Sequence, residues 1–300
     1  MKVSGTMEFF IDLMTNGLLV GLMYALVAVG FVLIYKATSI INFAQGDLVM
    51  LAGYGAAVML GLRGLPLWLM VLILCIGMIA LGFVLERGIL RPMIGQPLVS
   101  VIMVTIGLSF VLQGLVAIVW GAGTRKLELP VPLAPYVVGP VFISPINVVA
   151  AVIALVFLIA FGLFFTRSRL GVAMRAVADD QQASMVVGIR VSRVFALSWA
   201  IAGLAAAAGG IIWGNMLGAS SLLSLVGLKV FPVVILGGLD SIGGAIVGGL
   251  IMGAVESVAA GYLDPYVGGG TKDFIPYVLM ILVLFIRPYG IWGHETIERV

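Results

Sequence analysis

The sequence is poor in the residues from which soluble proteins build their surfaces and most of their chemical sites. Charged residues make up 10% of its 300 positions, against roughly 25% in a soluble globular domain. There is one histidine, and Cys75 is the single cysteine. So few charges cannot cover a soluble fold, which excludes soluble enzymes, disulfide scaffolds and disordered chains. No metal site, catalytic residue or cofactor is expected, because a His/Cys cluster or a histidine-based triad needs several such residues.

Motifs for binding nucleotides and nucleic acids are also missing. The chain has no Gly-x-x-x-x-Gly-Lys-Ser/Thr run, so it carries no phosphate-binding loop for ATP. The formal net charge of +3 is not gathered into a basic patch with interleaved aromatic residues, so nucleic acid is not an expected partner. In a membrane protein, an excess of arginine and lysine more often indicates orientation.

Long apolar runs take the place of the missing charges. Hydrophobic residues are 62% of the chain, and a helix needs roughly 20 apolar residues to cross a hydrocarbon core of ~30 Å. Such runs lie near 17–35, 40–60, 65–85, 98–120, 146–165, 194–218, 222–239, 242–263 and 274–287. Because the runs are continuous and not alternating, they predict helices and not barrel strands. The expected fold is a single all-α polytopic membrane domain over 1–300, with about nine transmembrane helices (eight to ten), two of them discontinuous.

The positive charges predict which side of the membrane each loop faces. Segment 167–193 carries five arginines, and positive charge in short loops marks the cytoplasmic side. Counting crossings from this segment places ten lysines and arginines inside, Arg299 among them, and five outside, with Arg63 among those. The N-terminus is then outside, the C-terminus cytoplasmic, and the proline-rich loop 121–145 extracytoplasmic. A re-entrant 222–239 segment would instead move the C-terminus outside.

The second apolar run opens with unusual polar residues, Asn42, Gln45 and Asp47, around Gly46. Polar and charged side chains inside a membrane are costly, so they usually face protein or a wet cavity. In one helix Asp47 would point away from Asn42, so either two faces are buried or the helix breaks near Gly46. A broken helix exposes polar ends to a transported solute. The alternative is an interfacial helix start, with Asn42 as the cap and Asp47 in the first turn.

A second interruption lies at Pro232 and the glycine-rich stretch that follows it, 237–244. Proline removes a backbone donor, so we expect it to split its span into two short pieces beside a translocation path. The alternative is a proline kink and a glycine turn without solute contact. In the next span, Glu256 shares a helix face with Gly249 and Gly253, whose spacing lets helices approach closely. Glu256 therefore faces a packed neighbour, where it lines the path, pairs with Lys229 or makes a structural hydrogen bond.

The longest polar segment predicted inside, 171–193, is rich in helix-favouring residues. A short helix is expected there, and Gly188 can end it. A folded helix between two spans suggests docking of a soluble partner. The alternative is a solvated connector.

Three stretches (40–47, 178–189 and 237–249) together resemble, in order and spacing, the permease subunits of branched-chain amino acid ABC transporters. The similarity runs from about Gly17 to Gly290. It implies a bacterial inner-membrane protein in the lipid bilayer that works with a second related permease, two cytoplasmic ATPases and an extracytoplasmic solute-binding protein. By the same resemblance, Asn42, Gln45 and Asp47 lie beside the path. The residues implied to couple to the ATPase are Ala178, Asp179, Asp180, Gln181, Ala183 and Gly188.

The function indicated is that of a non-enzymatic importer subunit, with ATP hydrolysis in separate subunits. Its substrate would be a branched-chain amino acid or a related small amino acid or amide. An ion-coupled secondary transporter that titrates Glu256, Asp47 and Lys229 is the alternative. Which solute is carried, and whether the permeases form a homodimer or a heterodimer, stay open at this point.

Overall fold

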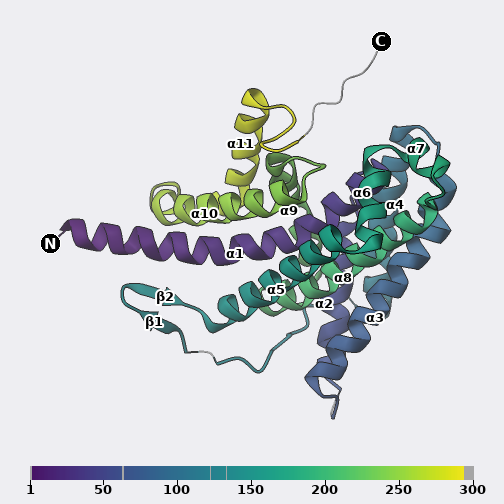
Figure 1. The fold of residues 1–300 in the computed structure, drawn as a ribbon. Helices are drawn as coiled ribbons and strands as arrows, with labels where there is room; N and C mark the ends of the chain where they lie inside the picture. Colours follow the sequence, from purple (N-terminus) through teal and green to yellow (C-terminus); the bar gives the residue numbers. More distant parts are fainter. Residues whose placement is uncertain (1, 63, 122, 133, 294–300) are drawn as a thin grey trace. The chain divides into compact units, whose positions relative to one another are not determined.

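The computed structural model describes residues 2–62, 64–121, 123–132 and 134–293, and it is almost entirely helical (Figure 1). Arg63, Arg299 and the histidine, His294, lie outside these residues. The α-helices are α1 (Lys2–Thr38), α2 (Gln45–Leu60), α3 (Leu67–Leu85), α4 (Leu98–Trp120), α5 (Pro145–Arg167), α6 (Arg169–Asp179), α7 (Gln181–Val186), α8 (Val191–Leu217), α9 (Leu225–Gly237), α10 (Ile242–Val267) and α11 (Thr271–Ile286). The shorter elements are the π-helical turn η1 (Glu86–Leu90), the 3-10 turns η2 (Arg91–Met93) and η3 (Ser221–Ser224), and the strands β1 (Tyr136–Val138) and β2 (Val141–Ile143).

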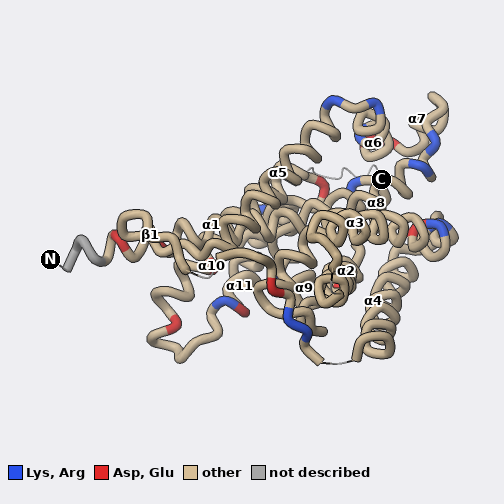
Figure 2. The backbone as a smooth tube through the Cα atoms, turned by 90° about the horizontal axis from the view of Figure 1, so that it is seen from below, with Lys and Arg blue, Asp and Glu red and all other residues tan. Residues whose placement is uncertain are grey.

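Each of the nine predicted spans falls on a helix, namely α1 to α5 and α8 to α11. Within the described ranges, six helices are long and apolar enough to cross a membrane, and α2 and Ser221–Gly237 are shorter apolar helices. The prediction of an all-α polytopic membrane protein is therefore confirmed. Figure 2 shows lysine and arginine mainly at helix ends and around α6 and α7, while the long helices are nearly free of charge.

The chain forms two compact units, the first made of Met1–Ala28, Leu129–Leu155 and Lys229–Val300. In this unit α1 and α10 pack through glycines. A Cβ on Gly21 would lie 2.7 Å from the backbone oxygen of Gly249, and one on Gly253 would lie 2.3 Å from that of Gly17. These distances leave no room for a side chain, which confirms that the glycine spacing in α10 lets a neighbouring helix approach.

The second unit is made of Val29–Glu128 and Val156–Leu228. Here α8 packs against both α2 and α3. Its Trp199 is fully buried, and a Cβ on Gly82 of α3 would lie 2.4 Å from the Trp199 backbone oxygen. Tyr54 of α2 is also fully buried, and its ring stacks on Trp120 at 5.9 Å between centroids. This unit holds the polar start of α2 and the segment of α6 and α7.

Of the two expected interruptions, the structure contains the one near Gly46 but not the one at Pro232. Pro232 does not split its span, because α9 runs through it as one helix from Leu225 to Gly237. Proline removes only one backbone donor, and the remaining hydrogen bonds hold the flanking turns together. In the second span, the residues before Gln45 are not helical, so the helix break lies one residue from Gly46, near the position considered from the sequence.

Candidate functional site

The start of α2 is a buried polar network. Asn42, in the turn before the helix, accepts a hydrogen bond from the Ala44 N–H at 3.1 Å. Its side-chain amide donates to Gln45 Oε1 at 3.3 Å, and Gln45 donates in turn to the backbone oxygen of Ala202 on α8 at 3.2 Å. Both side chains are fully buried. Ala44 occupies the N-cap position. The Asn42 side chain therefore accepts a backbone hydrogen bond in the turn before α2 and does not cap the helix itself.

Asp47 makes its contact on another side of the same helix. Its Oδ1 accepts a hydrogen bond from Gln113 Nε2 of α4 at 2.9 Å, and the same amide lies 3.3 Å from Ser109 Oγ. The residue is only 2% exposed, and no cation pairs with its carboxylate in the described part of the chain. The start of α2 therefore has two faces buried against protein, and Asp47 lies in the first turn of the helix.

Gly46 lets the start of α2 pack directly against η3 and the start of α9. A Cβ on Gly46 would lie 2.2 Å from the backbone oxygen of Ser224 in η3 and 2.9 Å from Cα of Gly227 in α9. Backbone therefore touches backbone where α2 begins and α9 begins. Pro232 is buried one turn and a half further along α9.

Glu256, in the other unit, is buried in α10 with 6% exposure. Tyr24 of α1 hydrogen bonds to its carboxyl group, while Oε2 has no hydrogen-bond partner among the described residues. The pairing with Lys229 considered from the sequence is not formed. Lys229 Nζ instead lies 2.8 Å from Asp273 Oδ1 at the start of α11. The salt bridge forms there because Asp273 is exposed to water and a charge pair costs less where desolvation is incomplete.

The segment expected to be one short helix is two. Asp180 has an extended backbone, and its carboxylate accepts the Ala183 N–H at 2.9 Å, which makes it the N-cap of α7. Asp179 is thus the last residue of α6, which separates Ala178 from Ala183 and Gln181. Gln181 anchors α7 by donating to the Ala37 backbone oxygen of α1 at 3.3 Å.

Gly188 ends α7 in the expected way, with a φ of +87°. Only glycine adopts this left-handed backbone without strain. Just before it, Met185, Val186 and Val187 are 57%, 87% and 75% exposed. A cluster of exposed apolar side chains on a polar segment is a feature of protein contact surfaces. We call these three residues the α7 tip.

Sequence reasoning missed Gln113 and Tyr24. A signal for the first existed, because Thr105, Ser109 and Gln113 recur every four residues in an apolar span and so share one helix face. Thr105 Oγ1 donates to the Ile41 backbone oxygen at 3.3 Å, next to the α2 network. Tyr24 left no such signal, since aromatic residues are common in membrane helices.

Comparisons with known proteins agree on one family. The family model described as branched-chain amino acid transport system, permease component, matches residues 13–284. The permease protein LivH of the high-affinity branched-chain amino acid transport system of Salmonella typhimurium is 34% identical, over 97% of this chain and 98% of that protein. BraD of the corresponding system of Pseudomonas aeruginosa is 33% identical over the same shares.

More distant similarities extend beyond that transport system. A fructose import permease protein, FruF of Bifidobacterium longum, is 27% identical over 78% of this chain and 66% of its own length. The solved structure of PsaBC from Streptococcus pneumoniae in complex with Fab matches 93% of this chain and 96% of its own, with a TM-score of 0.51 and 14% identity. At that identity the match concerns the fold alone.

Proposed function

Because the chain belongs to the family of permease components of branched-chain amino acid transport systems, we propose that it carries a branched-chain amino acid, or a related small amino acid or amide, into the cytoplasm. It is the permease subunit of an ATP-binding-cassette importer. The observation that carries this conclusion is the family match over residues 13–284, nearly the whole chain.

The transport cycle requires partners that this chain does not supply. The sequence has no phosphate-binding loop, so ATP would be hydrolysed by two separate cytoplasmic subunits. A second related permease and an extracytoplasmic solute-binding protein complete the proposed assembly, in a bacterial inner membrane. Residues 121–145 would then face the binding protein, with the N-terminus outside and residues 167–193 in the cytoplasm.

The α6–α7 segment is the proposed contact with the ATPases, which involves Ala178, Asp179, Asp180, Gln181, Ala183 and Gly188. Its support is structural, since both helices are capped and α7 is tied to α1 through Gln181. Because α7 is anchored in this way, a partner that displaces the α7 tip can transmit this movement to α1. The apolar α7 tip supplies a surface that a partner would cover.

The start of α2 is the proposed lining of the solute path, through Asn42, Gln45 and Asp47. Amide and carboxylate groups held within the membrane can replace the water shell of an amino acid as it passes. All three side chains are buried and hydrogen-bonded within the protein, so a solute would reach them only after the surrounding helices move. Pro232 and Glu256 remain further proposed path residues, on the strength of the sequence alone.

Purification of the full chain from its native membrane tests this assignment. We expect two ATPases, a second permease and a binding protein to co-purify, and the binding protein to bind leucine, isoleucine or valine. Uptake of radiolabelled leucine by cells should stop on ATP depletion and survive an uncoupler of the proton gradient. Uptake that survives ATP depletion and collapses with the uncoupler would instead identify an ion-coupled secondary transporter.

A further inference from the structure

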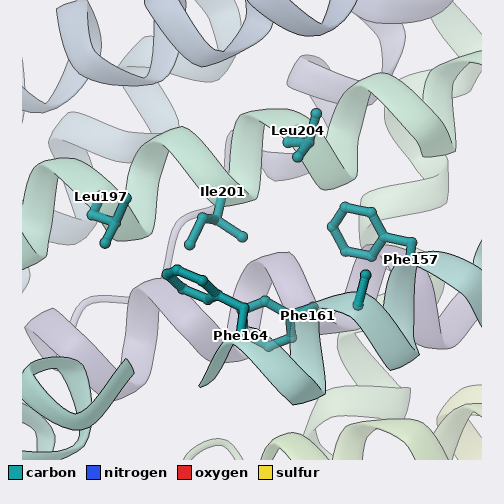
Figure 3. Close-up of a pocket in the computed structure, with 7 residues that line it drawn as sticks. Phe157, Phe161, Phe164, Leu197, Ile201 and Leu204 are labelled. Carbon is teal, nitrogen blue, oxygen red and sulfur yellow. The ribbon is translucent and has the colours of Figure 1, made fainter. Parts of the chain in front are cut away.

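A groove of purely apolar side chains runs along the second unit between α5 and α8 (Figure 3). It is lined by Phe157, Ala160, Phe161 and Phe164 of α5 and by Leu197, Ile201 and Leu204 of α8. Figure 3 shows the two helices antiparallel, with Phe157 near Leu204 and Phe164 near Ile201. The groove encloses about 280 Å³, slightly less than the ~300–1,000 Å³ of most small-molecule sites.

The groove lies beside a helix that the rest of this chain leaves mostly uncovered. Only 28% of the apolar window of α5 is buried, against 78% for α8. Water in the groove would find no hydrogen-bonding partner on its lining side chains, so hydrocarbon is the stable filling. A flexible chain of methylene groups fits such a slot between phenyl rings.

One end of the groove is marked by arginine. Arg167 follows Phe164 by three residues and Arg193 precedes Leu197 by four, which places each about 4–6 Å further along its helix axis. Both are exposed, and neither pairs with a carboxylate in the described part of the chain. Figure 2 shows the blue of arginine at this end of α5 and around α6.

A third arginine adds positive charge at the same end. Arg175 of α6 donates to the backbone oxygens of Phe165 and Thr166, and its guanidinium lies 5.4 Å from the centre of the Phe165 ring. It therefore closes the last turn of α5 without neutralising any charge. The nearest acidic groups in sequence, Asp179 and Asp180, lie at the far end of α6, where Asp180 is occupied in capping α7.

We propose that this groove binds one anionic phospholipid, with an acyl chain between the phenyl rings and the headgroup phosphate held by Arg167 and Arg193. Arginine binds phosphate through two parallel N–H groups, and basic sites between transmembrane helices recognise anionic headgroups. The unpaired arginines favour a lipid over a second protein, because an apolar helix laid in the groove would leave both guanidinium groups without a counter-charge. The proposal requires only that the chain is embedded in a membrane, so it stands or falls independently of the transported solute.

The test uses phosphatidylglycerol that carries a diazirine in the middle of one acyl chain. The purified full-length chain is mixed with this probe in mild detergent, irradiated, digested, and mapped by mass spectrometry. We expect labelling concentrated on 157–164 and 197–204, and much less labelling of these peptides by phosphatidylcholine with the same diazirine. Equal labelling by the two lipids, or labelling spread evenly over all spans, would overturn the proposal.

Matched variants separate the two halves of the site. Ala160→Phe should fill the groove and abolish this labelling, while Ile159→Phe, on the neighbouring lipid-facing position, should leave it unchanged. Replacing Arg167 and Arg193 together by glutamine should lower labelling by phosphatidylglycerol roughly tenfold or more, and Arg287→Gln in the other unit should not. If Ala160→Phe does not fold, the arginine variants decide alone, and unchanged labelling in them refutes the headgroup site. Crosslinks from the groove to another polytopic subunit in the purified assembly would show that protein, not lipid, covers it.

Discussion

Gln113, in the middle of α4, donates its side-chain amide to the carboxylate of Asp47 in the first turn of α2 at 2.9 Å. The contact joins two helices far apart in the chain through an acidic side chain that is only 2% exposed. A buried acceptor that loses its donor costs about 1–3 kcal/mol, whereas removing both partners is close to neutral.

Gln113→Leu is therefore expected to destabilise the purified chain by about 1–3 kcal/mol and to lower its thermal midpoint. The double variant Gln113→Leu, Asp47→Leu should recover much of that loss. Thermal unfolding of all variants in the same detergent measures the difference. A single variant as stable as the parent would mean that Asp47 does not depend on Gln113.

The close approach at Gly46 gives a second prediction. A Cβ there meets backbone atoms of Ser224 and Gly227, which cannot rotate away, so Gly46→Ala must push η3 and α9 from α2. We expect a loss of about 1–3 kcal/mol together with reduced leucine uptake.

Gly77→Ala on α3 is the matched control, because no heavy atom outside its own turn lies within 4 Å of the new Cβ. That substitution should be neutral or slightly stabilising in a helix. Thermal unfolding and uptake are measured on both variants at equal expression. Equal stability of the two would show that α2 and η3 do not touch as described.

The positions of the helices were predictable because membrane spans depend on a local quantity, the length of an apolar run. Where local rules compete with packing, the sequence was less informative. Pro232 sits inside α9 because the rest of the helix tolerates one missing donor. The helix break at Asp180 was missed because this residue could either continue α6 or cap a new helix. It caps α7, and composition alone does not distinguish the two outcomes.

Partners of polar residues were the least predictable part of the candidate site. Gln113 and Tyr24 contact Asp47 and Glu256 through packing between helices that are remote in sequence. Lys229 forms its salt bridge with Asp273 and not with Glu256, although the sequence contains both carboxylates as candidate partners. These side-chain contacts depend on which faces of two helices pack together. A single sequence indicates the polar and apolar faces of each helix, but not which faces of different helices pair.

Gly188 provides a third prediction, on coupling. Nothing lies within 4 Å of a Cβ built there, so a larger residue is limited only by its backbone conformation. Gly188→Val should cost about 1–2 kcal/mol of local strain and disorder the end of α7. Gly188→Asn should be tolerated, since asparagine adopts the left-handed region with less strain.

If α7 couples to the ATPases, Gly188→Val lowers ATP-dependent leucine uptake severalfold while membrane insertion stays normal. Gly188→Asn keeps most of the uptake. Uptake is measured in cells, with insertion checked by the yield of folded protein in the membrane fraction. Equal uptake by the two variants would remove Gly188 from the coupling role.

The orientation of the α7 tip is the last prediction, and it can be tested because the chain has a single natural cysteine. Cys75 is replaced by serine, and Val187, which is 75% exposed, is replaced by cysteine. If residues 167–193 face the cytoplasm, a membrane-impermeant maleimide should label Val187→Cys in inverted vesicles and not in intact cells. Phe142→Cys, 60% exposed on β2 within loop 121–145, should show the opposite pattern. Because the two sites are expected on opposite sides of the membrane, each serves as the other's control for reagent access. Labelling of Val187→Cys from outside intact cells would reverse the proposed topology, and an ATPase in the cytoplasm could then not reach the α7 tip.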